Sequence, residues 1–201
     1  MSSTGDTITL STSDDPPVLI KVPRSALVAN SKVFADMLSL PVKSDNQDES
    51  IPISENESEI KVFLSMLESN ESQENLAALT EAQWRMIAKL SDKYDSWSVR
   101  KAVEAKAWQV EAEGGSAAFA FALATLTGNQ ELIKHTAKRV VLIPDLRSSR
   151  LHVTQEWKDR LAAWRTVQAS NCLRQLQALS NKPQCSRDYD SMRKLLRYKA
   201  N

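Results

Sequence analysis

The residues that most often bind metal ions are few in this chain. His135 and His152 are the two histidines, and Cys172 and Cys185 are the two cysteines. The histidines fall on different predicted elements, whereas zinc requires three or four ligands that converge on one point. We therefore expect no metal site, with His135 on the polar face of a helix and His152 in a loop.

The signatures of nucleophilic catalysis are also missing from the sequence. No serine lies in a G-x-S-x-G pattern, and no run of glycines could cradle a phosphate group. Cys172 falls on the apolar stripe of a predicted helix, which predicts a small buried hydrophobe. Cys185 lies in a polar, basic stretch, where we interpret its thiol as exposed and incidental. We expect no enzymatic activity and no cofactor.

Acidic residues gather before one apolar run, at Glu55, Glu57 and Glu59. Ser54 and Glu57 have the spacing of a capping box, in which two side chains satisfy backbone N–H groups at a helix start. Acids in a first helical turn also complement the helix dipole. We interpret these carboxylates as structural, not as a pair for acid–base catalysis.

The two halves of the chain carry opposite charge. Residues 1–79 hold 13 acids and 5 bases, a net charge of −8, and residues 80–201 hold 12 acids and 21 bases, a net charge of +9. Such polarity can indicate a basic tail that meets nucleic acid. We favour a solvated surface, or a tail that folds onto the acidic half of its own chain.

The basic tail interleaves two tyrosines, Tyr189 and Tyr198, with five cationic residues: Arg187, Arg193, Lys194, Arg197 and Lys199. Cations could contact phosphates while tyrosines stack on bases. The alternative hypothesis is therefore a nucleic-acid-associated regulator that uses residues 146–201. We favour an amphipathic helix docked on its own chain, because apolar residues recur in the tail at helical spacing.

Four of the five tryptophans fall at helical positions typical of a core: Trp84, Trp108, Trp157 and Trp164. Trp97 directly follows a short polar stretch at 95–96. Trp97 is a candidate for a partly exposed interface anchor, because exposed tryptophans are frequent interface hot spots. Burial in the core is the alternative, and the high average burial of large aromatic side chains favours it.

The elements at the start of the chain predict a small sheet. Residues 7–12 alternate in polarity, residues 18–22 are rich in β-branched side chains, and a turn cluster separates them. These segments predict an antiparallel hairpin. Residues 51–53 predict a third, short strand, which Pro52 places at an edge of the sheet.

Apolar residues recur at helical spacing through the rest of the chain. Ser25 and Ser31 are each placed to cap a short helix, and Thr80 opens a longer one. A pair of glycines at 114–115 ends a further helix and predicts a domain boundary. The sequence predicts an α+β fold, with a small sheet flanked by helices in residues 1–113. An all-α extension with a basic tail follows in residues 114–201.

Residues 22–38 resemble the signature of the BTB/POZ domain. The family pattern is roughly V-H-R-x-x-L, then S-x-V-F and M-L. This chain reads Val22-Pro23-Arg24-Ser25-Ala26-Leu27, then Ser31-Lys32-Val33-Phe34 and Met37-Leu38, with proline in place of histidine. Residues 88–95 resemble the family's A-D-K-Y segment, and the resemblance continues at intervals to about residue 110. Residues 116–141 resemble the helical extension of many fungal BTB proteins.

The resemblance implies protein–protein interaction and not catalysis. BTB domains form homodimers through their N-terminal elements and first helix, here around Leu27 and Val28. Many are adaptors that present a partner to a cullin-type ubiquitin ligase or to chromatin complexes. Adaptors that bind a cullin carry an apolar-x-Glu motif in the loop after the Met-Leu helix. Here Val42 is followed by Lys43 and Ser44, with Ser44 in place of Glu, which puts cullin binding in doubt.

Three further features bear on the cellular compartment. No apolar run approaches the ~20 residues of a membrane helix, and the first residues, MSSTGDTITL, have neither the basic nor the apolar region of a signal peptide. Two cysteines 13 residues apart do not form a disulfide framework. We expect a cytoplasmic or nuclear chain with protein partners, without membrane or nucleic-acid binding.

Overall fold

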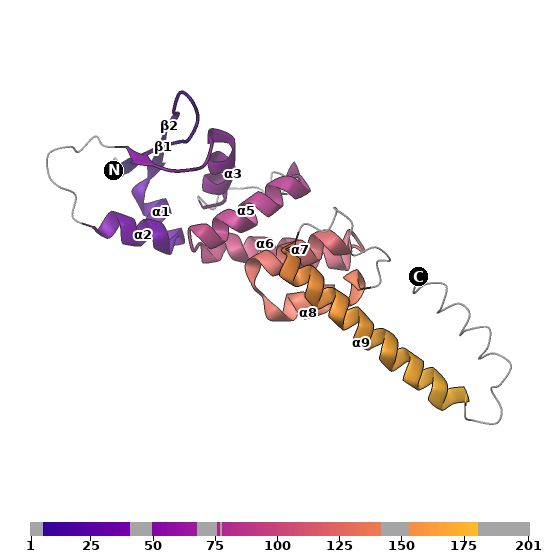
Figure 1. The fold of residues 1–201 in the computed structure, drawn as a ribbon. Helices are drawn as coiled ribbons and strands as arrows, with labels where there is room; N and C mark the ends of the chain where they lie inside the picture. The colour runs from indigo at the N-terminus through magenta and orange to yellow at the C-terminus, as the bar shows by residue number, and fades with distance from the viewer. Residues whose placement is uncertain (1–5, 41–49, 68–75, 77, 142–152, 181–201) are drawn as a thin grey trace. The chain divides into compact units, whose positions relative to one another are not determined.

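The computed structural model describes residues 6–40, 50–67, 76, 78–141 and 153–180 (Figure 1). The chain divides into two compact units, which separate after Ile133. The described part is an α+β structure, a small mixed sheet with helices, as the sequence predicted. Among these residues, no helix is long and apolar enough to cross a membrane.

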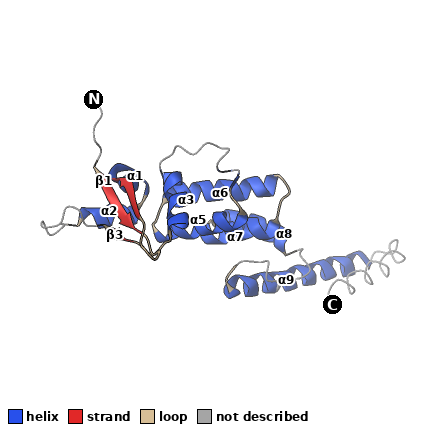
Figure 2. Cartoon of the chain, turned by 90° about the horizontal axis from the view of Figure 1, so that it is seen from above, coloured by secondary structure: helices blue, strands red, loops and turns tan. Residues whose placement is uncertain are grey.

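The sheet consists of β1 (Thr7–Ser11), β2 (Leu19–Pro23) and β3 (Ile51–Pro52) in the order β2-β1-β3. Strands β1 and β2 are antiparallel, which confirms the predicted hairpin, and β3 lies parallel to β1 at the other edge. Leu10 and Val22 share one face of the sheet and are buried. Figure 2 shows the strands beside helices α1 and α2.

Helices α1 (Arg24–Asn30) and α2 (Lys32–Ser39) follow the hairpin. Ser31 caps α2 as predicted, because its Oγ accepts a hydrogen bond from the Phe34 N–H at 3.1 Å. The same hydroxyl donates to the carbonyl of Tyr94 at 2.6 Å. The predicted cap at Ser25 was wrong: α1 begins at Arg24, directly after Pro23, so Ser25 lies inside the helix and no side chain caps α1.

Helix α3 (Glu57–Leu67) begins with a capping box shifted by two residues from the predicted one. Asn56 Oδ1 accepts from the Glu59 N–H at 2.9 Å, and Glu59 Oε2 accepts from the Asn56 N–H at 3.3 Å. Asn56 and Ser54 are both good caps. The Ser54 hydroxyl is engaged elsewhere, with the Lys93 ammonium at 2.6 Å.

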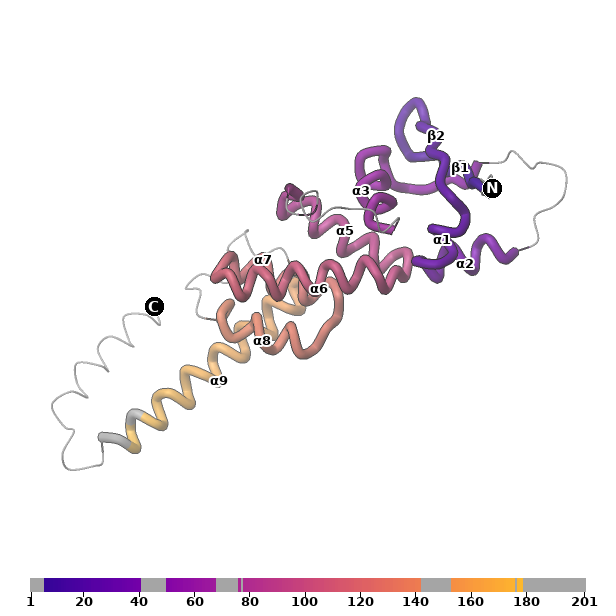
Figure 3. The backbone as a smooth tube through the Cα atoms, turned by 180° about the vertical axis from the view of Figure 1, so that it is seen from behind, coloured from indigo at the N-terminus to yellow at the C-terminus, as the bar shows by residue number. Residues whose placement is uncertain are grey.

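Helices α5 (Glu81–Lys93), α6 (Trp97–Ala112) and α7 (Ala117–Thr127) pack against one another, and α6 and α7 lie side by side in Figure 3. Gly114 has φ +68 and ends α6 as predicted, and left-handed backbone favours glycine there. The compact unit nevertheless continues past the expected boundary at 113–114. Apolar α7 buries its side chains against α5 and α6, and the predicted domain boundary stays a prediction.

Helix α8 (Gln130–Val140) buries an apolar face that includes Leu132 and Val140, as predicted. Helix α9 (Gln155–Ser180) is buried at Leu161, but residues 166–175, 177 and 178 are exposed. Cys172 lies in that stretch and is exposed. The prediction of a buried Cys172 was therefore wrong, because no described part of the chain covers α9 there.

We expect Ser31→Ala to lower the free energy of unfolding by about 1–2 kcal/mol, because the change removes a helix cap and leaves a buried carbonyl without its donor. Urea denaturation monitored by circular dichroism would measure the loss. Ser39→Ala is the matched control, because Ser39 is exposed and its loss should cost about 0.5 kcal/mol or less. Equal effects of the two changes would contradict a special role for Ser31.

Candidate interaction surface

Helix α1 presents three small side chains away from the core. Ser25, Val28 and Ala29 are exposed, and their spacing places them on one face of the helix. Val28 is 43% exposed. Leu27, which the sequence paired with Val28 as an interface residue, lies on the opposite side of α1 and is fully buried. Leu27 therefore belongs to the core, and Val28 is the exposed member of the pair.

Hydrogen bonds at both ends hold α1 in place. The Arg24 N–H donates to the Asp6 carbonyl at 2.9 Å, and Arg24 Nη2 donates to the Leu38 carbonyl at 2.7 Å. At the other end, Asn30 Nδ2 donates to the carbonyl of Leu67 at 2.9 Å. These bonds tie α1 to the start of β1, to α2 and to α3, so its outer face is preformed.

Strand β2 adds exposed side chains next to α1. Leu19, Lys21 and Pro23 are exposed and alternate with Ile20 and Val22, which are turned toward the interior. Leu19 was not among the predicted interface residues. The signal was available, because strand residues two apart share a face and Lys21 marks the outward one.

Trp97 begins α6 and is 66% exposed. The turn that precedes it is firmly held. Buried Ser96 donates its N–H to the Ser91 carbonyl at 2.9 Å, and Lys32 donates its N–H to the Asp95 carbonyl at 3.3 Å. Asp95 adopts a left-handed φ of 43, a conformation that aspartate tolerates. Trp97 is exposed on this rigid turn, and its role in an interface stays a prediction.

Trp108 was predicted to lie in the core together with Trp84. Trp84 is buried as predicted, but Trp108 is 42% exposed. The core face of α6 is formed by Val99, Val103 and Ala107. Trp108 follows Ala107 directly, and one residue along an α-helix turns the side chain by about 100°, away from this face.

A buried carboxylate lies behind these surfaces. Glu55 is 5% exposed. Its Oε2 accepts a hydrogen bond from the Tyr94 hydroxyl at 2.5 Å, and its Oε1 accepts one from the Lys93 ammonium. The Tyr94 ring stacks on Phe34, with centroids 4.6 Å apart, and packs on Phe63 at 5.3 Å. One cluster thus joins α2, α3 and α5.

The environment sets the protonation of this cluster. Burial alone would raise the pKa of Glu55, but the hydrogen bonds from Lys93 and Tyr94 and the charge of Lys93 outweigh burial and lower that pKa. Burial and the adjacent carboxylate both raise the pKa of the Tyr94 hydroxyl. Neither pKa moves toward neutrality, so neither group is matched to proton transfer near pH 7.

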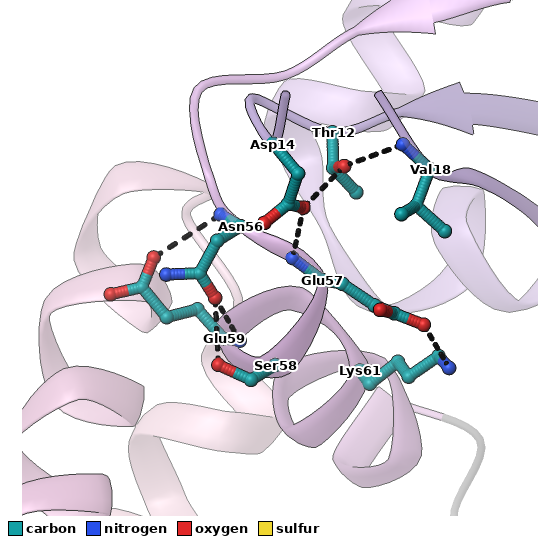
Figure 4. A network of polar contacts seen from close by, with 8 residues as sticks. All are labelled: Thr12, Asp14, Val18, Asn56, Glu57, Ser58, Glu59 and Lys61. Atoms are coloured by element: carbon teal, nitrogen blue, oxygen red, sulfur yellow. Dashed lines mark hydrogen bonds and ion pairs between the residues drawn. The ribbon is translucent and has the colours of Figure 1, made fainter. Parts of the chain in front are cut away.

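Asp14 joins the hairpin loop to the start of α3 (Figure 4). Its Oδ2 accepts from the Thr12 hydroxyl at 2.6 Å and from the Glu57 N–H at 2.7 Å. These two bonds lower the pKa of Asp14. Glu57 in turn pairs with Lys61 at 2.5 Å. The acids near this helix start have structural partners, in line with the sequence interpretation.

Within the described ranges, no three His, Cys, Asp or Glu side chains are grouped so that they could hold a metal ion. His135 is exposed on α8. His152 and Cys185 lie outside the described residues. The same holds for the predicted loop positions Val42 and Ser44, and for the predicted basic tail of Arg187, Arg193, Lys194, Arg197 and Lys199.

Comparison of the chain with protein-family models, with curated proteins and with solved structures finds no match.

We expect acid to destabilise the protein through Glu55. Because its folded-state pKa is lowered, Glu55 contributes stability above its unfolded pKa of about 4.3, and this contribution is lost as the pH falls through the folded value. Denaturant unfolding between pH 3 and 7 should therefore show a shallower acid loss for Glu55→Gln than for the wild type. Glu81→Gln, at an exposed carboxyl, should retain the wild-type pH dependence.

Proposed function

We propose that this chain is a non-enzymatic protein–protein interaction module of the BTB/POZ type, which self-associates or binds protein partners. The observation that carries the proposal is the outer face of α1. There Val28 and Ala29 are exposed on a helix that hydrogen bonds hold at both ends. The order of the described elements, a hairpin, two short helices, a short strand and further helices, is compatible with the proposed family.

A preformed apolar face favours docking for a physical reason. Association costs free energy when loops and side chains must be ordered, and a face on a fixed helix avoids most of that cost. Valine and alanine also have few side-chain rotamers to lose. The small outer face of α1 therefore suits close packing against the same face of a second copy across a two-fold axis.

The resemblance supports an adaptor role in a ubiquitin-ligase or transcriptional complex as the wider function. The serine at position 44 argues against the cullin branch of that role. The proposal places the chain in the cytoplasm or the nucleus. A reducing compartment of this kind would keep the exposed thiol of Cys172 free.

We expect Val28→Asp to weaken self-association through α1 about tenfold or more, because it buries a charge in an apolar contact. Light scattering on a size-exclusion column, over a dilution series of the intact chain, would measure the change in molar mass. Val167→Asp is the matched control, since Val167 is an exposed valine on α9.

The controls decide between outcomes. A lower mass for Val28→Asp alone, with unchanged circular dichroism, supports the α1 contact. Equal masses for Val28→Asp and the wild type would place self-association elsewhere. A monomeric wild type at every concentration would remove self-association from the proposed function.

A further inference from the structure

Helix α9 has an apolar side that no described residue covers. Ala169 and Leu173 are exposed one helical turn apart, and Leu173 is 46% exposed. The sequence continues this spacing with a leucine at position 176. Arg174, the only charged residue at positions 166–178, follows Leu173 directly and is turned by about 100° from that side. We call the side of α9 that carries Ala169 and Leu173 the α9 face.

The sequence after α9 carries a matching apolar pattern. Residues 187–199 lie outside the described residues, and apolar side chains recur in their sequence at helical spacing: Tyr189, Met192, Leu195 and Leu196. On a helical projection these four fall within about 120°. Four cations fall on the remaining side: Arg187, Arg193, Lys194 and Arg197. A segment of this kind has one side to bury and one side to leave in water.

We propose that residues 187–199 form a helix that packs antiparallel on the α9 face of the same chain. In an antiparallel pair of helices, the numbers of two facing residues add up to a constant. Leu195 with Leu173 and Met192 with position 176 have the same sum. One register therefore brings apolar residues together along the contact, and it leaves the four cations of the segment on the solvent side.

The lengths of the two segments and of their connection fit this arrangement. Positions 166–178 and 187–199 contain the same number of residues, and each would measure about 20 Å as a helix, at 1.5 Å per residue. Residues 181–186 connect them and include Pro183, which interrupts a helix. Connections of about 2–8 residues are usual between neighbouring helices. The segment can therefore reach the α9 face by a short turn.

Covalent connection favours the tail of the same chain over other occupants of the α9 face. A short linker holds a segment at an effective concentration of about a millimolar, well above that of a second copy in dilute solution. Small Ala169 also leaves room for two helices to approach at the usual axial distance of about 8–10 Å. Docking of the tail does not require the contact proposed on α1.

Limited trypsin digestion of the intact chain tests the docking. Trypsin cleaves after arginine and lysine, and it acts on a docked helix only when that helix opens locally. The rate of cleavage after Arg193, followed by mass spectrometry, therefore reports how often the tail leaves its site. We expect Leu173→Asp to raise this rate about tenfold or more, because a charge on the α9 face cannot be buried without cost.

Val167→Asp is the matched control. Val167 is also an exposed apolar residue of α9, but it lies about 120° around the helix from Leu173. The same charge placed there should leave the cleavage rate after Arg193 unchanged. Circular dichroism would confirm that both variants keep the helical content of the wild type.

A second pair of changes tests the register. Leu195→Lys in the Leu173→Asp chain places opposite charges face to face, and it should slow cleavage after Arg193 about twofold or more relative to Leu173→Asp alone. Tyr198→Lys in the Leu173→Asp chain adds the same charge on the side of the tail helix that faces away from α9, and it should give no recovery. Equal recovery by the two lysines would overturn the register.

The remaining outcomes decide the proposal. Faster cleavage in Leu173→Asp alone, at a rate that does not depend on protein concentration, supports docking of the tail on its own chain. Equal cleavage in the wild type and Leu173→Asp would overturn the proposal, and so would equal acceleration by Leu173→Asp and Val167→Asp. Wild-type protection that fades on dilution would assign the α9 face to the tail of a second copy, and it would likewise overturn docking within one chain.

Discussion

The N-terminal unit depends on one buried carboxylate. Ionised Glu55 is stable in the interior only because Lys93 and Tyr94 donate hydrogen bonds to it. The backbone of the same residues extends the cluster: the Glu55 carbonyl accepts from the Ser13 N–H at 2.9 Å, and the Tyr94 carbonyl accepts from Ser31. Hairpin, α2, α3 and α5 therefore meet at one polar centre. The loss of Lys93 would leave the charge of Glu55 uncompensated, and the loss of the Tyr94 hydroxyl would remove a hydrogen bond from it. Either change would loosen several elements together.

This interior order bears on the exposed surfaces of α1 and α6. The inward sides of α1 and α6 are fixed by apolar packing at Leu27 and Val103, and by the turn that precedes Trp97. Their outward residues are consequently presented from a rigid frame. Small side chains dominate the α1 face, whereas two large aromatic rings, those of Trp97 and Trp108, are exposed on α6. The two surfaces thus differ in kind: one favours close helix approach, and the other favours the burial of large rings.

Periodicity in the sequence predicted much of the fold, because burial repeats with the geometry of each element. The alternation that ends at Leu10 predicted β1, and the unbroken apolar run of α7 predicted a buried helix. Two of the features that escaped prediction have a clear physical reason. The cap of α3 is Asn56 and not Ser54, since Lys93, distant in sequence, engages the Ser54 hydroxyl. Cys172 lies on the helix face that the apolar periodicity predicts to be buried. Periodicity does not show, however, whether another element extends far enough along the helix to cover that position.

The position of Pro23 limits how the sheet can grow. Pro23 lies opposite Thr7 in a non-hydrogen-bonded pair of the antiparallel ladder, in which the backbone N–H and C=O groups point away from the partner strand. The backbone nitrogen of Pro23, which has no hydrogen, therefore points to the outer edge of β2, and the sheet loses no internal hydrogen bond. Only Leu19 and Lys21 can offer outward N–H groups along that edge. A further strand would find few partners there, and the charge of Lys21 also discourages one. The β2 edge therefore disfavours the addition of further strands, and the contact proposed on α1 lies on a helix surface instead.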